Sequence, residues 1–195
     1  MNREVKGKVV VVTGAANGLG LAMVTSFLDQ GVRFAILLDM DEQKGKESLA
    51  NLKQKFGNDR AVFYKCDVSK DLDKIFETIK NNHKHIDILV NNAGVLDEGN
   101  LKRTMDINSI AVMEWTVKFY KYMSLANGGT THTNMADYPN AWEDSVNEFV
   151  EDLKSNYDWQ DPSAIGEGTV EIFRKADSGS AWVVEGSRSA EKIKV

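Results

Sequence analysis

The sequence predicts an α/β fold built on a parallel β-sheet that helices cover on both faces. Strand-like and helix-like segments alternate through the first two thirds of the 195 residues. The strand-like segments are apolar on both faces and the helix-like segments are amphipathic, which is the pattern of a parallel sheet buried between helices. The length suits one domain with a substantial hydrophobic core.

Each of the first four strands is followed by a helix with its apolar residues along one face. In the second helix, for example, Leu49, Leu52 and Phe56 share a face. In chain order the predicted elements are strand Lys8–Thr13, helix Gly18–Asp29, strand Arg33–Asp39, helix Asp41–Phe56, strand Ala61–Cys66, helix Asp71–Asn81, strand Ile86–Asn91 and helix Met105–Leu125.

The alternation ends at Gly128 and Gly129, and Thr130–Trp142 has no strand pattern. Further on, Asp161 is a capping residue that precedes Pro162, and proline is favoured at the first position of a helix. The remaining predicted elements are an acidic helix over Glu143–Lys154, a helix from Pro162 to about Ala176 and a last strand over Ala181–Glu185, followed by a polar tail.

The composition narrows the class of partner. With 24 basic and 29 acidic residues, the net charge of -5 argues against nucleic acid or an anionic membrane as the main partner. The single cysteine, Cys66, lies in an apolar stretch, so we interpret it as a core residue in a reducing compartment. The N-terminal apolar run is short and predicts a strand rather than a signal peptide. We therefore expect a cytoplasmic protein without a membrane span or a metal site.

A glycine-rich turn, "TGAANGLG", joins the first strand to the first helix. Gly14 permits a sharp turn, Gly18 lets the backbone approach a pyrophosphate, and Gly20 lets the helix pack closely on the sheet. A phosphate would then lie at the helix N-terminus, where N–H groups and the helix dipole favour an anion. The spacing departs from G-x-G-x-x-G, and without further context it favours a plain strand-to-helix turn.

Asp39 strengthens the dinucleotide interpretation. It ends the second predicted strand, nineteen residues after Gly20, where a carboxylate would accept hydrogen bonds from the adenosine ribose hydroxyls. A carboxylate at that place also repels a 2′-phosphate and so favours NAD over NADP. The alternative is that Asp39 caps the next helix, a role for which Asp41 competes.

Four blocks together resemble the short-chain dehydrogenase/reductase family: Thr13–Gly20, Cys66–Val68 ("CDV"), Asn91–Val95 ("NNAGV") and Asn108 in "MDINS". They occur in the family's order at the ends of predicted strands. With Asp39, they are most similar to the NAD-dependent branch that includes insect alcohol dehydrogenase and 15-hydroxyprostaglandin dehydrogenase.

The resemblance implies NAD as cofactor and a role for each matching position. Around the pyrophosphate it places Thr13, Gly14, Asn17, Gly18, Leu19 and Gly20. At the adenosine it places Asp39, Met40, Asp67 and Val68. Along the rest of the cofactor it places Asn91, Ala93, Gly94 and, in a later loop, Thr131. In isolation Asp67 could instead cap the helix near Asp71, and "NNAG" could be a simple turn.

The resemblance also implies catalytic residues, most of which this chain lacks. The family uses a Ser, a Tyr-x-x-x-Lys pair and an Asn, because a phenol needs a nearby ammonium to act as a base at neutral pH. Asn108 matches the Asn. None of the five tyrosines is followed by lysine four positions later. Lys118 and Tyr122 have the reverse order, and we expect them to point away from the site.

The missing residues map to one place. Gly129–Thr133 resembles the loop after the family's sixth strand, yet it directly follows the Asn108 helix. The resemblance therefore implies a truncated, Rossmann-like doubly wound sheet without strands five and six and the helix between them, on the order of 50–60 residues. On this view residues 1–195 form one domain, with an intact cofactor-binding part in 1–127 and a remnant in 129–195. The fourth strand becomes an edge unless Ala181–Glu185 pairs with it.

Three hypotheses follow. The first is a shortened NAD-dependent oxidoreductase of secondary alcohols or carbonyls that binds NAD but has little or no catalysis. The second is a non-catalytic nucleotide-binding or regulatory protein, which either retains NAD as a sensor or pairs with an intact subunit and inhibits it. Helix 105–125 would be the partner surface, and the same helix could form a homo-oligomer. The third is a chain that does not fold stably.

Overall fold

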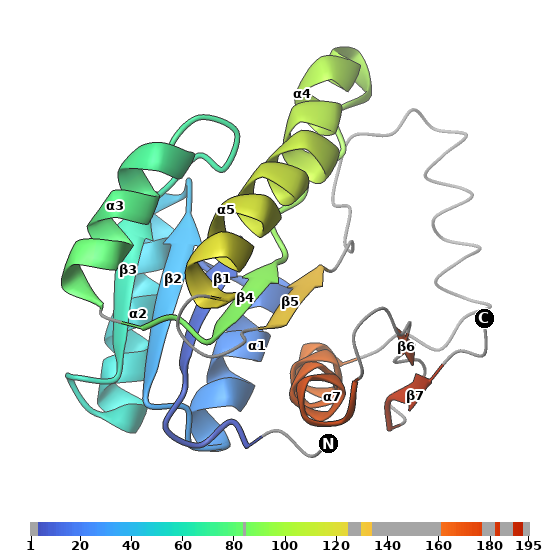
Figure 1. Cartoon of the computed structure of the whole chain (residues 1–195). Helices are drawn as coiled ribbons and strands as arrows, with labels where there is room; N and C mark the ends of the chain where they lie inside the picture. The colour runs from blue at the N-terminus through green and yellow to red at the C-terminus, as the bar shows by residue number, and fades with distance from the viewer. Residues whose placement is uncertain are drawn as a thin grey trace.

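A parallel sheet lies between two layers of helices (Figure 1). The computed structural model describes residues 4–83, 85–124, 130–133, 161–176, 182–183 and 189–192. The five strands have the order β3-β2-β1-β4-β5, and every neighbouring pair is parallel. The predicted α/β fold class is confirmed. The elements are β1 Val9–Thr13, α1 Gly18–Asp29, β2 Phe34–Asp39, α2 Glu42–Phe56, β3 Ala61–Lys65, α3 Leu72–Asn82, β4 Ile88–Asn91, η1 Glu98–Asn100, α4 Leu101–Met105, η2 Asp106–Ala111, α5 Val112–Ser124, β5 Thr130–Thr133, α7 Pro162–Lys175, β6 Trp182–Val183 and β7 Glu191–Lys192.

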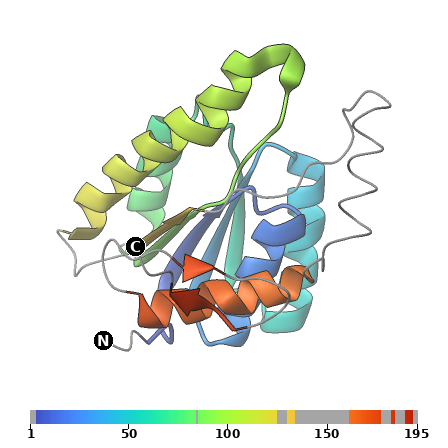
Figure 2. The same ribbon diagram turned by 90° about the vertical axis from the view of Figure 1, so that its right-hand side faces the viewer.

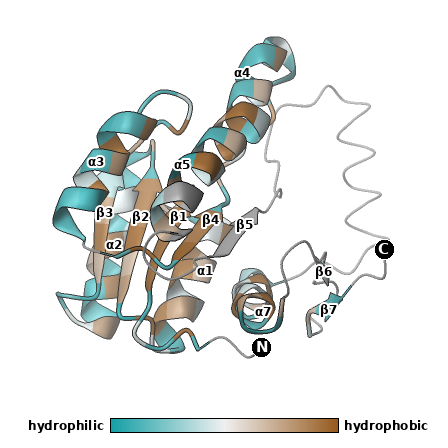
Figure 3. Cartoon of the chain, viewed as in Figure 1, coloured by the Kyte–Doolittle hydropathy of each residue, from teal (hydrophilic) through white to brown (hydrophobic). Residues whose placement is uncertain are grey.

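Helices lie on both faces of the sheet (Figure 2), and each face has its own hydrophobic core. Because side chains alternate across a strand, Val10 and Val12 of β1 pack towards α1, α2 and α7. Val9 and Val11 pack towards α3 and α5 on the opposite face. Figure 3 shows β2 and β4 as apolar strands, in contrast to the polar outer surface of α3. This burial on both faces explains why the strands are nearly continuous apolar runs.

Helix α7 begins and ends where the sequence predicts and packs directly on α1. The Asp161 side chain accepts a hydrogen bond from the Ser163 backbone N–H at 2.8 Å and so caps the helix. A Cβ atom on Gly166 would lie 2.4 Å from Ser26 Oγ and 2.7 Å from the Ala22 carbonyl oxygen. The two helices therefore approach each other so closely that only glycine fits at this position.

The structure corrects the prediction at the edge of the sheet. Thr130–Thr133, to which the sequence analysis gave no strand, forms β5 and pairs with β4, with Thr131 opposite Leu89. A neighbouring strand satisfies the backbone N–H and C=O groups that a bare β4 edge would expose. β6 (Trp182–Val183) does not pair with β4; it forms a separate antiparallel pair with β7 (Glu191–Lys192).

The long helix after β4 begins earlier than predicted and changes its winding. It starts at Leu101, where the Asn100 side chain accepts a hydrogen bond from the Arg103 backbone N–H at 3.0 Å. Residues Asp106–Ala111 are π-helical before α5 continues to Ser124. The π-helical winding adds a residue to the turn and changes the direction of the side chains it carries. The predicted helix Glu143–Lys154 lies outside the described residues.

No helix in the described part of the chain is long and apolar enough to span a bilayer. The same residues contain no group of three or more His, Cys, Asp or Glu side chains placed to hold a metal ion.

Candidate functional site

A groove of about 410 Å³ lies at the carboxyl ends of β1, β2 and β4. It is located where the strand order changes direction between β1 and β4, the usual ligand position in open parallel sheets. Eleven of the sequence-predicted residues line this groove together: Gly14, Asn17, Gly18, Leu19, Gly20, Asp39, Met40, Asp67, Val68, Ala93 and Gly94. The predicted set therefore forms one continuous surface, although the elements that contribute to it are far apart in the sequence.

Each of the three glycines in the loop is required for a different structural reason. Gly14 has a φ of +65°, and a Cβ there would lie 2.9 Å from Ala93 Cα. A Cβ on Gly20 would lie 2.1 Å from the Gly14 carbonyl oxygen. At both Gly14 and Gly20, therefore, close packing leaves no room for a side chain. Gly18 has a φ of +52°, but a Cβ there would meet no atom within 4 Å. Gly18 thus leaves open space above the loop.

The N-terminus of α1 faces this open space without a side-chain acceptor. The N-cap residue Asn17 makes no capping hydrogen bond, and the first turn of α1 contains no acidic residue. The N–H groups of a first helical turn have no partner within the helix and favour an anion. Together with the space above Gly18, they fit a pyrophosphate.

Asp39 lies at the groove and does not cap α2. Its Oδ2 accepts a hydrogen bond from the Ala16 backbone N–H, and its Oδ1 accepts one from the Asp41 backbone N–H, both at 2.9 Å. Asp41 caps α2 by accepting a hydrogen bond from the Lys44 backbone N–H at 3.0 Å. Each Asp39 oxygen retains lone-pair capacity for a further donor, as ribose hydroxyls would require. The structure therefore assigns the competing capping role to Asp41.

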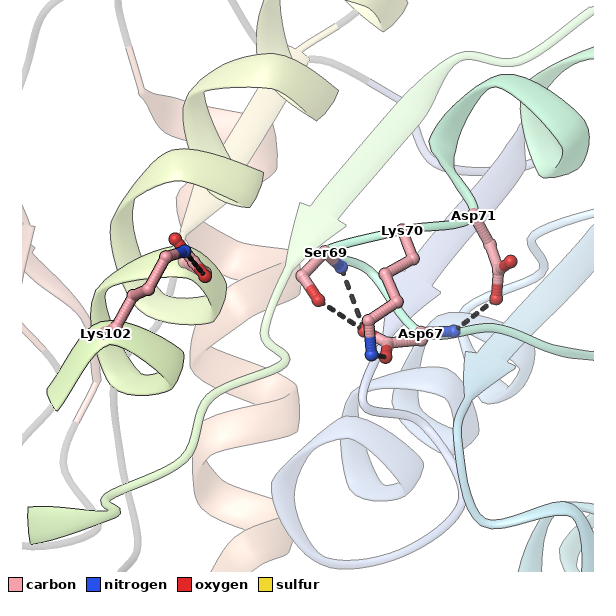
Figure 4. A network of polar contacts seen from close by, with 6 residues as sticks. Asp67, Ser69, Lys70, Asp71 and Lys102 are labelled. Carbon is pink, nitrogen blue, oxygen red and sulfur yellow. Dashed lines mark hydrogen bonds and ion pairs between the residues drawn. The ribbon is translucent and has the colours of Figure 1, made fainter. Parts of the chain in front are cut away.

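Asp67 is held in a network at the far end of the groove (Figure 4). Its Oδ1 accepts hydrogen bonds from the Ser69 backbone N–H at 3.1 Å and from Ser69 Oγ at 2.7 Å. Its Oδ2 accepts one from Lys70 Nζ at 2.8 Å. Partial burial opposes ionisation, but these hydrogen bonds outweigh it and lower the pKa of Asp67. The carboxylate is thus charged and partly exposed, and the neighbouring residues Ser69 and Lys70 fix its orientation.

Thr13 and Asn91 lie beneath the groove and do not line it. Thr13 Oγ1 accepts hydrogen bonds from the backbone N–H groups of Asn92 and Ala93, both at 3.0 Å. Asn91 Nδ2 donates to Thr116 Oγ1 on α5 at 3.0 Å. The asparagine that lines the groove is Asn92, whose Nδ2 donates to the Thr13 and Gly14 carbonyl oxygens at 3.0 and 3.1 Å. Thr13 therefore supports the backbone of the loop after β4, while Asn91 ties the end of β4 to α5.

Asn108 holds the backbone of Val95, a residue that lines the groove. From the π-helical segment, its Oδ1 accepts a hydrogen bond from the Val95 N–H at 2.9 Å and its Nδ2 donates to the Val95 carbonyl oxygen at 2.7 Å. Both polar atoms of its side chain are therefore used on one residue. Thr131 lies in β5 beside β4, and its side chain lies outside the described part of the structure.

The reversed Lys118 and Tyr122 pair does not reach the groove, as predicted. Lys118 forms an ion pair with Asp73 of α3, and its Nζ lies 5.1 Å from the centre of the Phe76 ring. Tyr122 Oη donates to the His83 carbonyl oxygen at 3.5 Å. Both side chains line a different hollow, between α3 and α5.

Sequence reasoning missed four residues that line the groove: Cys66, Asn92, Val95 and Ile107. Cys66, Asn92 and Val95 lie inside the quoted motif blocks but were given no role at the cofactor, and Ile107 precedes Asn108. Cys66 is 2 % exposed, as its interpretation as a core residue requires. Burial, reinforced by the charges of Asp71, Asp67 and Asp39, raises the pKa of its thiol to about 12 and excludes it as a thiolate nucleophile near neutral pH.

Comparison with known proteins identifies the family. The family model for short chain dehydrogenases matches residues 8–131, and the chain belongs to this family. It is 39% identical over 128 residues to 15-hydroxyprostaglandin dehydrogenase (NAD(+)) of Macaca fascicularis, an alignment that covers 65% of this chain and 48% of that protein. The chain thus spans about half the length of the curated relatives it matches.

Solved structures agree with the fold. L-sorbose reductase from Gluconobacter frateurii, in complex with NADPH and L-sorbose, matches with a TM-score of 0.62 and 26% identity over 69% of this chain and 54% of that one. A short chain dehydrogenase/reductase from Burkholderia phymatum, in complex with NAD, matches with a TM-score of 0.62 and 20% identity over 80% of this chain and 60% of that one.

Proposed function

We propose that this chain binds NAD(H) in the groove and has little or no dehydrogenase activity of its own. The observation that carries the binding proposal is the Asp39 carboxylate, fixed beside the glycine loop by the Ala16 N–H. The relatives support the same cofactor class, since the Macaca fascicularis protein is named for NAD(+) and the Burkholderia phymatum structure contains NAD.

The preference for NAD over NADP follows from charge. A 2′-phosphate would lie next to the Asp39 carboxylate, and two negative charges at that distance repel each other. The following residue, Met40, is 53% exposed and offers no positive charge to offset that repulsion. The family alone does not decide the matter, because the L-sorbose reductase neighbour contains NADPH.

The residues of the groove account for binding and orientation. NAD supplies hydride acceptance when bound. The N-terminus of α1 would hold its pyrophosphate, Asp39 its adenosine ribose, and Asp67 with Val68 its adenine. Asn108 fixes the Val95 backbone in the wall of the groove.

The expected lack of turnover follows from proton transfer. Oxidation of a secondary alcohol requires a base for the hydroxyl proton, and an unassisted phenol with a pKa near 10 is a poor one at neutral pH. No Tyr-x-x-x-Lys pair exists in the sequence. The nearest substitute, Lys118 with Tyr122, lies on the α3 side of α5 and contacts Asp73 and His83.

We expect the purified chain to bind NADH but to form none from NAD and a panel of secondary alcohols. Binding is measured by the increase in NADH fluorescence on titration, and turnover by absorbance at saturating NAD. An active NAD-dependent dehydrogenase assayed in parallel controls for the substrates. Sustained NADH formation by this chain would contradict the proposed loss of catalysis.

We also propose a second role, self-association through the α4–α5 surface. Figure 3 shows hydrophobic segments along α4 and α5. Five apolar side chains of residues 101–117 are between 44% and 67% exposed: Leu101, Met105, Ile110, Met113 and Val117. An apolar stripe of this kind is typical of a surface that a partner covers.

The test is sedimentation velocity of the wild type and of a Met113→Lys, Val117→Lys double variant. We expect the wild type to form a dimer that the double variant does not form. Lys74→Ser, on the exposed surface of α3, is the matched control and leaves the dimer intact. A wild type that stays monomeric at all concentrations would exclude this role.

A further inference from the structure

Trp115 of α5 connects the helix layer to the wall of the groove. Its side chain is 1% exposed, and its indole Nε1 donates a hydrogen bond to the Val68 carbonyl oxygen at 2.9 Å. Val68 lines the groove next to Asp67. The indole ring stacks on Phe119, with ring centres 5.5 Å apart and an angle of 13° between the planes. Burial and ring stacking therefore hold the indole N–H of Trp115 in a fixed orientation.

The hydrogen bond fixes a peptide group that also orients Asp67. The Val68 carbonyl and the Ser69 N–H belong to one planar peptide unit. Trp115 donates to the carbonyl end, while the N–H end donates to Asp67 Oδ1 at 3.1 Å. Rotation of this peptide would break both contacts at once. Trp115, 48 residues away in the sequence, thus acts together with Ser69 Oγ and Lys70 Nζ in setting the direction of the Asp67 carboxylate.

We propose that Trp115 is a positioning residue for adenine recognition. This inference rests on the proposed binding of NAD, in which the exocyclic amino group of adenine donates to Asp67. With the peptide held by Trp115, the carboxylate is presented in one direction, so that little ordering is required on binding. The indole N–H thereby contributes to selectivity for a 6-amino purine without contacting the ligand.

The test compares NAD with nicotinamide hypoxanthine dinucleotide, in which a carbonyl oxygen replaces the 6-amino group. Trp115→Phe removes the N–H donor and keeps an aromatic ring against Phe119. We expect the preference for NAD over the hypoxanthine analogue to fall by about three- to tenfold, the worth of one hydrogen bond, while affinity for the analogue stays nearly unchanged. Both affinities are measured by calorimetric titration.

Phe119→Leu is the packing control, because it removes the aromatic ring that stacks on Trp115 and leaves the indole N–H in place. It should lower stability and leave the selectivity ratio unaltered. If Trp115→Phe weakens both ligands equally, Trp115 has a purely structural role and the inference is wrong. If the wild type binds neither ligand, the proposed function itself fails.

A second measurement needs no variant and applies even if Trp115→Phe does not fold. Hydrogen exchange of the Trp115 indole N–H is followed by NMR in the wild type. NAD should slow this exchange more than the hypoxanthine analogue does at matched saturation, because only NAD gives Asp67 a further donor. Equal protection by the two ligands would overturn the inference.

Discussion

Replacing Asp39 with alanine is expected to weaken NAD binding by about ten- to hundredfold, the effect of losing hydrogen bonds to a charged acceptor. Asp39 has both oxygens at the groove, and the Ala16 N–H fixes one of them at 2.9 Å. The same substitution removes the charge that repels a 2′-phosphate, so the ratio of NAD to NADP affinity should fall further than NAD affinity alone. Calorimetric titration of both cofactors measures the two effects.

Asp41→Ala is the control for this variant. Asp41 is two residues away and caps α2 through the Lys44 N–H. Its loss should lower the free energy of unfolding by about 1 kcal/mol, the usual effect of removing an N-cap, and leave NAD affinity unaltered. If Asp39→Ala retains NAD affinity within about twofold of the wild type, the ribose assignment is wrong.

Alanine at Gly20 is expected to lower the free energy of unfolding by about 2–4 kcal/mol, because the new methyl group would overlap the loop. The added Cβ would lie 2.1 Å from the Gly14 carbonyl oxygen and 2.7 Å from Asn92 Nδ2. The first of these atoms belongs to the backbone and moves only if the turn opens. Urea denaturation followed by circular dichroism measures the loss.

Gly18→Ala in the same loop should behave in the opposite way. A Cβ there meets no atom within 4 Å, so the loss of stability is limited to the strain of a positive φ, about 1 kcal/mol. The methyl group would instead occupy the space proposed for the pyrophosphate and weaken NAD binding by more than about tenfold. Equal effects of the two variants on stability and affinity would contradict the separate roles of these glycines.

Strands β1, β2 and β4 could be predicted because they are buried on both faces and are therefore almost entirely apolar, whereas β3, at the edge of the sheet, is only partly buried. β5 could not, because Thr130–Thr133 is short and polar and is ordered by the edge of β4 rather than by its own pattern. The π-helical winding at Asp106–Ala111 could not be predicted either, because one additional residue in a turn only shifts the spacing of the apolar residues along the helix.

The candidate site shows the same division. Motif residues in the glycine loop and at Asp39 could be placed because strand ends in a parallel sheet meet at one edge. The orientation of Asn91 could have been predicted, because side chains alternate between the two faces of a strand. Leu89 packs towards α5, so Asn91 faces α5 as well, and Asn92 is the residue that lines the groove. The contact of Trp115 with Val68 was not predictable, because it joins two elements that only the fold brings together.

The most direct test of the account is a calorimetric titration of the purified wild-type chain with NAD, ADP-ribose and NADP. If the adenosine diphosphate half provides the affinity, NAD and ADP-ribose should bind at one site with similar affinity. NADP should bind more weakly by about tenfold or more, as loss of the ribose contacts and repulsion by Asp39 require. No heat from millimolar NAD, or equal affinity for NADP, would contradict the central claim that this chain is built to hold NAD.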